Sequence, residues 1–378
     1  MSVSGCGRRA LVASVAVMAL AGARAYAQAH WSDIVDPARN DLPDPNPVVI
    51  KNWAQLPDGR IWGTTSGVDI GPDGQVWGID RCGGGSCGGS NSNVAPILKF
   101  DRSSGKVLKS LGAGIFLFPH GLYVDRDGNV WVTDARAATE EEIKKFPGDK
   151  GKGHTVVKFN SDGKVLLTLG TPGIAGDPSG AFNGAFNEPA AVTTAPNGDI
   201  FVADGHSGQY ETAGRPSVAR IVKFTKEGKF VKEWGRLGFA PGEFRTPHAL
   251  AFDSRGRLFV ADRGNNRIQI FDQEGKFLDQ WWQFSRVSGL FIDRNDTLYA
   301  IDSESADPSH PSWKRGIRIG TTKEDKVVAF IPPHESDQPQ HGVAGEGVAV
   351  DSEGNVYSAE GAEPLNIGAR GLTKYVKR

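Results

Sequence analysis

The sequence has few cysteines, almost no net charge and few long hydrophobic runs. Only 3 of its 378 residues are Cys, which excludes a small scaffold held together by disulfides. The formal net charge of −1 gives no electrostatic reason to bind nucleic acid or an anionic membrane. Beyond the first residues, no apolar run is long enough to cross a bilayer. We therefore expect no nucleic-acid partner and no membrane anchor.

The first 27 residues have the pattern of a cleavable signal peptide. Arg8 and Arg9 precede a short apolar stretch at 10–21, and Ala25 and Ala27 form a small-x-small cleavage site. Cys6 precedes the apolar stretch, where it is badly placed for a lipid anchor. We expect cleavage after residue 27 and a periplasmic or secreted protein.

Glycine, in contrast, is abundant, and the two remaining cysteines lie in a glycine-rich loop. Cys82 and Cys87 flank Gly-Gly-Gly-Ser. In an oxidising compartment this spacing favours a disulfide that closes a small loop. A two-thiolate metal site is the alternative, but no second pair of ligands accompanies it.

A repeated strand pattern determines the fold class. Its clearest copy is Gly-Leu-Tyr-Val-Asp-Arg-Asp-Gly-Asn-Val-Trp-Val-Thr-Asp, in which alternating apolar residues flank a tight turn. Six copies occur, at 67–80, 121–134, 191–204, 249–262, 289–302 and 347–360. A second hairpin follows most copies, as at 156–166 and 221–231. Two hairpins form a four-stranded blade, so the sequence predicts an all-β, six-bladed propeller of antiparallel blades.

The two ends of the chain complete the ring. The last residues, 372–376, match the third strand of a blade, and 49–56 resembles the missing fourth strand. A blade built from both termini leaves no free sheet edge. We expect a signal peptide at 1–27, an N-terminal extension at 28–48 and the propeller at 49–378. The only helical pattern, at 139–146, falls in a loop.

The residue that precedes each hairpin differs from blade to blade. In blade order these residues are Ser66, His120, Ala190, His248, Ser288 and Glu346. Alternate blades lie about 120° apart around the channel, so the two His and the Glu converge. Two His and one Glu suit a catalytic zinc with an open position. Alternatively, the histidines are structural, and Glu346 binds substrate or accepts a hydrogen bond, with His341 as a substitute ligand.

The residue that follows each hairpin emerges on the same face of the propeller. Two of these residues are arginines, Arg81 and Arg263, whose planar guanidinium groups suit a carboxylate. Pairing of Arg263 with acids of a neighbouring blade is the alternative. His206 and Tyr210 lie in the loop after the third hairpin, and either one could act as a general base or be solvated.

The pattern Gly-x-x-x-Asp-x-x-Gly-Asn-x-apolar-Val-x-Asp resembles the NHL repeat. Within that group, the sequence resembles the lyase domain of peptidylglycine α-amidating enzymes, a zinc-containing six-bladed propeller. The segments that carry this resemblance are 119–134, Pro-His-Ala-Leu-Ala at 247–251, and 260–269. The resemblance implies zinc at His120 and His248 and active-site arginines at Arg81 and Arg263. It also implies cleavage of a peptidyl-α-hydroxyglycine into a peptide amide and glyoxylate.

The chain departs from this family at three positions. Glu346 stands at the position of the family's third zinc-ligating His, and His206 stands at that of its catalytic Tyr unless Tyr210 serves. The family's channel calcium is held by carbonyls that match Val68 and Leu122 and by an Asp. Gly347 replaces that Asp, which argues against calcium.

These observations favour an exported, zinc-dependent lyase of an unidentified substrate. We expect a monomer whose substrate is a small molecule or peptide bearing a carboxylate. The alternative is a non-catalytic propeller that binds protein or glycan through its channel face. A lactonase-like hydrolase ranks lower, because the predicted channel mouth is poor in the acids of a calcium site.

Overall fold

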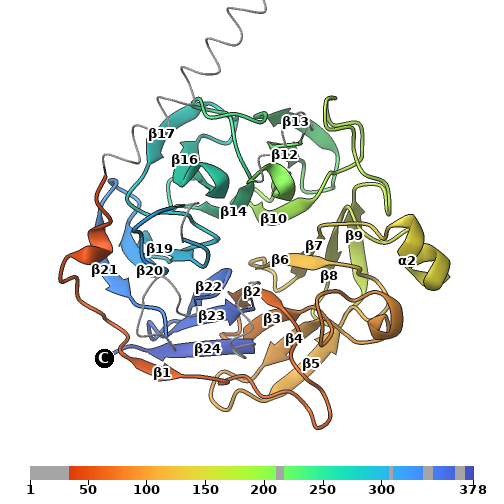
Figure 1. Cartoon of the computed structure of the whole chain (residues 1–378), viewed down its shortest axis with the longest axis horizontal. Coiled ribbons are helices and arrows are strands. Elements are labelled where there is room, and N and C mark those ends of the chain that lie inside the picture. The colour runs from red at the N-terminus through yellow and green to blue at the C-terminus, as the bar shows by residue number, and fades with distance from the viewer. Residues whose placement is uncertain (1–33, 210–216, 306–309, 335–343, 362–370) are drawn as a thin grey trace, which may run out of the picture.

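Alternating apolar strands and tight turns build a ring of six antiparallel sheets in the computed structural model (Figure 1). The structure describes residues 34–209, 217–305, 310–334, 344–361 and 371–378. The first two blades are β2 (Thr65–Ile70), β3 (Val76–Asp80), β4 (Ile97–Phe100) and β5 (Val107–Leu111), then β6 (Pro119–Val124), β7 (Val130–Asp134), β8 (Thr155–Phe159) and β9 (Val165–Leu169). The predicted fold class is confirmed.

The next three blades repeat this order along the chain. They are β10 (Pro189–Thr194), β11 (Ile200–Asp204), β12 (Arg220–Phe224) and β13 (Phe230–Trp234); β14 (Pro247–Phe252), β15 (Leu258–Asp262), β16 (Arg267–Phe271) and β17 (Phe277–Trp281); and β18 (Gly289–Ile292), β19 (Thr297–Asp302), β20 (Gly316–Thr321) and β21 (Val327–Ile331). The first strand of each blade lines the central channel, and hydrophobic clusters fill the space between neighbouring sheets.

The sixth blade closes the ring with strands from both ends of the chain. β22 (Gly347–Val350), β23 (Val356–Glu360) and β24 (Gly371–Val376) are joined by β1 (Val48–Ile50), which pairs antiparallel with β24. This closure was predicted, although the N-terminal strand ends at Ile50 rather than continuing to Leu56. The signal peptide expected at 1–27 lies outside the described residues. In the part of the chain that the structure describes, no helix is both long and apolar enough to cross a membrane.

Among the described residues, helical structure is confined to short segments outside the strands. α2 (Glu140–Lys145) begins after Thr139, whose hydroxyl and Glu142 form a reciprocal cap, so the predicted loop helix is confirmed. Single turns of 3₁₀ helix are η1 (Pro37–Arg39), η2 (Gly89–Asn91), η3 (Pro147–Asp149), η4 (His206–Gln209) and η5 (Arg263–Asn265).

The repeated acids at the ends of the second strands accept hydrogen bonds from the segments that precede the channel strands. Asp134 accepts hydrogen bonds from the backbone N–H groups of Leu117 (2.9 Å) and Phe118 (2.5 Å), just before β6. Asp262 accepts one from Arg245 (2.6 Å), just before β14. The acids of the series are fully buried: Asp80, Asp134, Asp204, Asp262 and Asp302. They fix the start of each channel strand, which is where the candidate site residues lie.

Removing one of these acids should therefore destabilise the fold. We expect Asp134→Ala to lower the free energy of unfolding by about 2–4 kcal/mol, because two buried N–H groups lose their acceptor. Urea denaturation followed by circular dichroism measures this change. Asp162→Ala, which removes an exposed carboxylate, is the control and should shift the value by no more than about 0.5 kcal/mol. Equal stability of the two variants would contradict the structural role of Asp134.

Candidate metal centre

Backbone bulges place the two channel histidines. In β14, Pro247 pairs with Asp262 and Ala249 with Ala261, so His248 is the extra residue between two pairs. β6 has a register shift at the same point, between Pro119 and Leu122. A bulge turns the extra side chain away from the regular pleat. Pro at the first strand position and the bulge after it together aim His120 and His248 into the channel mouth.

Each of these histidines is oriented by a carbonyl of the next blade. Nδ1 of His120 lies 2.9 Å from the carbonyl oxygen of Ala190, and Nδ1 of His248 lies 2.6 Å from that of Ser288. A carbonyl only accepts, so Nδ1 carries the proton and Nε2 keeps its lone pair. Both Nε2 atoms are buried and have no hydrogen-bond partner among the described residues. A metal-binding imidazole usually donates its other ring N–H to a carbonyl or carboxylate in this way, which fixes the orientation of the ring.

A third imidazole completes the cluster. Gly205, with a φ of 120°, passes so close to the Val218 carbonyl that no side chain fits there. η4 then begins at His206, whose ring centroid is 4.6 Å from that of His120 and 5.2 Å from that of His248. Potential ligand atoms of the three histidines all lie within 4.8 Å of one another. This donor set fits a divalent transition metal such as zinc.

The electrostatic surroundings keep the three imidazoles neutral, which is the form that binds metal. Burial, together with the nearby Arg81 guanidinium, lowers the pKa of His120 to about 3. Burial likewise holds the pKa of His206 and of His248 well below the usual value for histidine. The lone pairs are therefore available across the physiological pH range.

Glu346, the predicted third ligand, lies beside the cluster. Its Oε2 is 3.8 Å from Nε2 of His120, and its Oε1 is 3.7 Å from Nη1 of Arg263. Burial raises the pKa of this carboxyl, against the opposing effect of Arg263 and Arg81. Because the His206 ring lies beside both other imidazoles, Glu346 has a competitor for the third ligand position, and its ligation stays a prediction.

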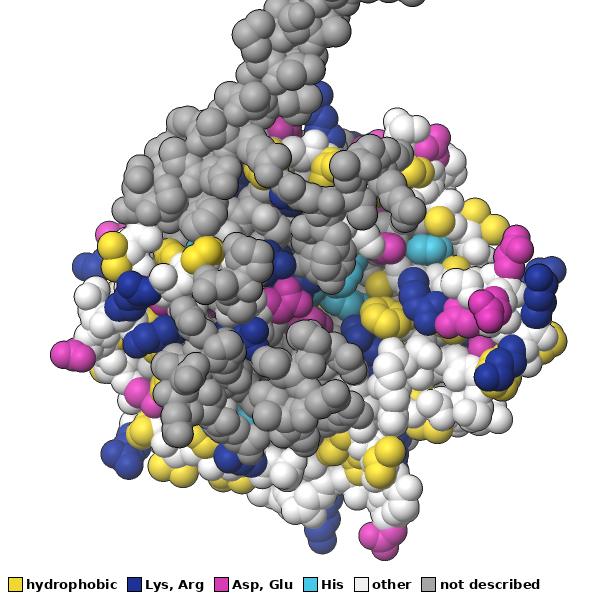
Figure 2. Space-filling model, in the orientation of Figure 1, with side chains coloured by type: hydrophobic (Ala, Val, Ile, Leu, Met, Phe, Trp, Pro, Cys, Tyr) yellow, Lys and Arg dark blue, Asp and Glu magenta, His cyan; other side chains and the backbone are white. Residues whose placement is uncertain are grey.

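Both predicted arginines lie at this site. Arg81 places its guanidinium 3.8 Å above the Phe118 ring and donates through Nε to the Pro119 carbonyl (3.2 Å), directly before His120. Arg263, at the start of η5, is fully buried, and its Nη2 lies 3.3 Å from Nε2 of His206. Figure 2 shows histidine and acidic side chains together at the centre of this face, with cationic side chains beside them.

Two further charged residues at this site were not anticipated from the sequence. Glu304 lies 3.4 Å from Nη1 of Arg263 and 3.1 Å from Nη2 of Arg286. Arg286 also donates to the Arg263 carbonyl (3.1 Å). The pairing of Arg263 with an acid of the neighbouring blade, left open above, is thus present alongside its position at the cluster. Glu304 comes directly after Ser303, which follows the fifth hairpin as Arg81 and Arg263 follow the first and fourth. This equivalence could have predicted that Glu304 lies near the site.

The loop after β3 carries the predicted disulfide. Cys82 and Cys87 are joined, so the disulfide interpretation is favoured over a two-thiolate metal site. The bridge closes the loop that begins immediately after Arg81, and Arg81 donates its backbone N–H to the Thr64 carbonyl (2.9 Å). Tyr210 and His341 lie outside the described residues, and the structure gives no position for either.

Comparison with known proteins assigns the fold to a family. The NHL repeat model matches residues 116–139 and 244–271. Human NHL repeat-containing protein 3 is 34% identical over 296 residues, which cover 76% of this chain and 75% of that protein. The chain belongs to the NHL-repeat propellers. Among its described residues, the cluster that could hold a metal is the one formed by His120, His206 and His248.

This NHL-repeat propeller is also similar to amidating enzymes. Peptidyl-glycine alpha-amidating monooxygenase A of Xenopus laevis is 34% identical over 272 residues, which cover 69% of the chain but only 25% of that protein. Peptidyl-alpha-hydroxyglycine alpha-amidating lyase 1 of Drosophila melanogaster is 31% identical over 291 residues, or 72% of the chain and 48% of that protein. The chain thus spans a quarter to about half of these relatives.

Solved structures share the fold alone. A gluconolactonase from Xanthomonas campestris superposes with a TM-score of 0.52 at 14% identity, covering 88% of this chain and 95% of that one. A virginiamycin B lyase from Staphylococcus aureus gives 0.50 at 15% identity, covering 82% of this chain and 81% of that one. At this identity the likeness carries no argument about activity.

The third ligand can be identified by paired variants. His206→Ala and Glu346→Gln each remove one potential metal-ligand group from the site. If His206 is the third ligand, His206→Ala should weaken zinc binding at least about 100-fold, because it removes one of the three clustered imidazoles. We expect Glu346→Gln, which keeps the side-chain volume, to weaken it by less than about tenfold. Competition with a chromophoric chelator measures both affinities. The reverse order would restore Glu346 as the ligand and contradict the assignment of His206.

Proposed function

We propose that this propeller is a zinc-dependent lyase that cleaves the N–C bond of a peptidyl-α-hydroxyglycine or a similar carbinolamide acid. The observation that carries the proposal is the convergence of three neutral imidazoles, two of them buried and that of His206 partly exposed, beside two buried arginines. Similarity to an α-amidating monooxygenase and to a peptidyl-α-hydroxyglycine α-amidating lyase over about 70% of the chain supports it. The substrate identity and the metal identity are both part of the proposal.

The residues present suit the cofactor. The Nε2 atoms of His120 and His248 are buried and have no hydrogen-bond partner among the described residues, a costly arrangement that a cation would relieve. His120, His206 and His248 would hold the zinc ion. When bound, zinc would supply a Lewis acid that favours loss of the proton from the substrate hydroxyl.

The arginines would orient the substrate carboxylate. Arg263 has no exposed surface, and its Nη1 atom lacks a hydrogen-bond partner among the described residues. Arg81 is held at the same mouth by Phe118 and the Pro119 carbonyl. Two buried guanidinium groups form strong, directional hydrogen bonds with a carboxylate. They would place the carbon that bears the hydroxyl next to the three imidazoles.

The reaction requires one proton to move from oxygen to nitrogen. The hydroxyl proton leaves, the carbonyl of glyoxylate forms, the N–C bond breaks, and the amide nitrogen gains a proton. With His206 in the metal cluster, Oε2 of Glu346 is a nearby acceptor, since it has no hydrogen-bond partner among the described residues. If Glu346 ligates instead, His206 takes the acceptor role. The paired variants above distinguish these two arrangements.

Product release tests the proposal directly. Purified protein loaded with zinc should release stoichiometric glyoxylate and peptide amide from a short peptide that ends in α-hydroxyglycine. The same peptide ending in glycine should remain intact, because it lacks the hydroxyl. Absence of glyoxylate from a zinc-loaded protein would overturn the lyase proposal. That result would favour the non-catalytic alternative, a propeller that binds protein or glycan through this face.

A further inference from the structure

The channel continues below the histidines as a cavity of about 380 Å³. It is lined by successive residues of the six channel strands, from the level of Ser66 and His120 to the opposite end of these strands. Arg126, Ser254 and Arg294 also line it and are exposed, so the cavity reaches solvent on the face opposite the arginine pair. Its volume falls in the range of small-molecule sites.

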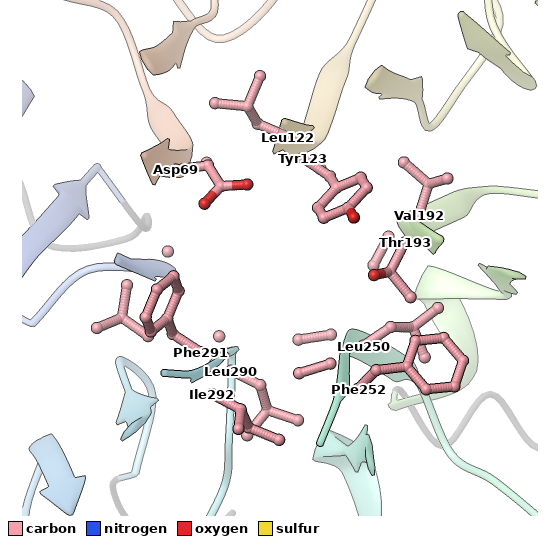
Figure 3. Close-up of a pocket in the computed structure, with 18 of the residues that line it drawn as sticks. Asp69, Leu122, Tyr123, Val192, Thr193, Leu250, Phe252, Leu290, Phe291 and Ile292 are labelled. Atoms are coloured by element: carbon pink, nitrogen blue, oxygen red, sulfur yellow. The ribbon is translucent and has the colours of Figure 1, made fainter. Parts of the chain in front are cut away.

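One level of the channel combines a carboxylate with aromatic and hydroxyl groups. The strand register makes six residues equivalent there, one from each blade: Asp69, Tyr123, Thr193, Ala251, Phe291 and Ala349. All except Ala349 line the cavity. Figure 3 shows the Asp69 carboxylate, the Tyr123 ring and the Phe291 ring around one opening, with Phe252 on another side. This level lies three residues along the strand from the His120 level, or about 10 Å.

Asp69 is the acid at this level, and the basic residues that line the cavity, Arg126 and Arg294, belong to exposed turns at its outer mouth. Its two oxygens accept backbone N–H groups of Ile70 (2.8 Å) and Val124 (2.7 Å). Within the described part of the chain, no Lys or Arg forms an ion pair with it. Burial raises the pKa of Asp69 to about 7, and its proximity contributes to a raised pKa of the Tyr123 phenol. A cation that enters the cavity would stabilise the charged form of Asp69, and the Tyr123 and Phe291 rings lie at the same level.

We propose that this cavity binds a small organic ammonium ion. Its N–H groups would donate to Asp69, which forms stronger hydrogen bonds with a charged donor than with a neutral one. Its positive charge and apolar part would pack against the Phe291, Phe252 and Tyr123 rings. The site lies in the same channel as the proposed lyase centre, about 10 Å from its histidines, and does not depend on that activity. It assigns a ligand to the second mouth of the channel.

Binding of benzylamine, compared with benzyl alcohol, tests the proposal on the unmodified protein. The two molecules have nearly the same shape, but only the amine is cationic at neutral pH. Isothermal titration calorimetry should give at least about tenfold tighter binding of benzylamine. Asp69→Asn should abolish that preference, while Asp127→Asn, which changes an exposed acid next to Arg126 in the sequence, should preserve it. Equal affinities of the wild-type protein for the two probes would overturn the proposal, whatever the folding of the variants.

A second arm separates this site from the metal centre, because an amine can also bind zinc. The His120→Ala/His248→Ala variant should keep the benzylamine preference, since Asp69 and the aromatic rings are unchanged. Loss of the preference in that variant, with a retained circular dichroism spectrum, would mean that the amine binds at the histidines and would overturn the assignment to Asp69. Failure of glyoxylate release would leave the benzylamine result unaffected, so the two proposals fail independently.

Discussion

Loss of two imidazoles should empty the metal centre. We expect the His120→Ala/His248→Ala variant to fall from about one zinc ion per chain to less than about 0.1, because a single histidine does not retain zinc. Glyoxylate release should fall about 1,000-fold, equivalent to about 4 kcal/mol of transition-state stabilisation. Mass spectrometry with inductively coupled plasma measures the zinc content, and the product assay measures the rate.

The double variant needs a matched control. His334→Gln changes another buried histidine, which hydrogen-bonds Glu360 (2.7 Å) outside the cluster. It should retain both zinc and activity. The double variant should keep the β-sheet circular dichroism spectrum but melt at a lower temperature, because it has lost a stabilising ligand. Zinc retained at wild-type stoichiometry in the double variant would contradict the metal assignment.

Removal of the buried guanidinium group should have the second-largest effect. We expect Arg263→Ala to lower kcat/KM for the α-hydroxyglycine peptide by about 100- to 1,000-fold, or roughly 3–4 kcal/mol. The variant loses the proposed carboxylate contact and also leaves Glu304 and Glu346 without this cation, 3.4 and 3.7 Å away. Steady-state kinetics measures the loss, and zinc content should stay close to that of the wild-type protein.

Chemical rescue distinguishes a substrate contact from a purely structural role. Added guanidinium ion should partly restore activity in Arg263→Ala, because the truncated side chain leaves space beside the two carboxylates. Arg255→Ala, whose side chain is 54% exposed, should behave like the wild-type protein. A kcat/KM for Arg263→Ala within about threefold of the wild-type value would rule out the proposed role of this arginine.

The repeat explains why so much of the architecture could be predicted. A pattern that recurs six times makes residues equivalent, so His120, His248 and Glu346 could be assigned to one level of the channel before any coordinates were known. The same equivalence placed Arg81 and Arg263 on one face. Closure of the ring by β1 and β24 followed from a missing strand. These inferences needed only blade order and strand direction.

The parts of the site that were predicted incompletely lie where the repeat ends: His206 was expected on this face as a possible general base, but not as a member of the histidine cluster. His206 belongs to η4, and its approach to His120 depends on Gly205 running against the Val218 backbone. No other blade predicts that path. Glu304 and Arg286 come from the fifth blade, whose residue at the position of Arg81 and Arg263 is Ser303. Strand equivalence gives the level of a side chain but not its rotamer, which is why Glu346 could be placed at the cluster while its role could not be assigned.

The most direct test of the metal centre is anomalous X-ray scattering from crystals of the zinc-loaded wild-type protein. Data collected on both sides of the zinc absorption edge should give one strong difference peak within about 2.0–2.1 Å of a nitrogen of each of His120, His206 and His248. A peak bound by His120, His248 and Glu346, with His206 displaced, would overturn the three-histidine assignment. Absence of a peak at the channel mouth would contradict the metal centre itself.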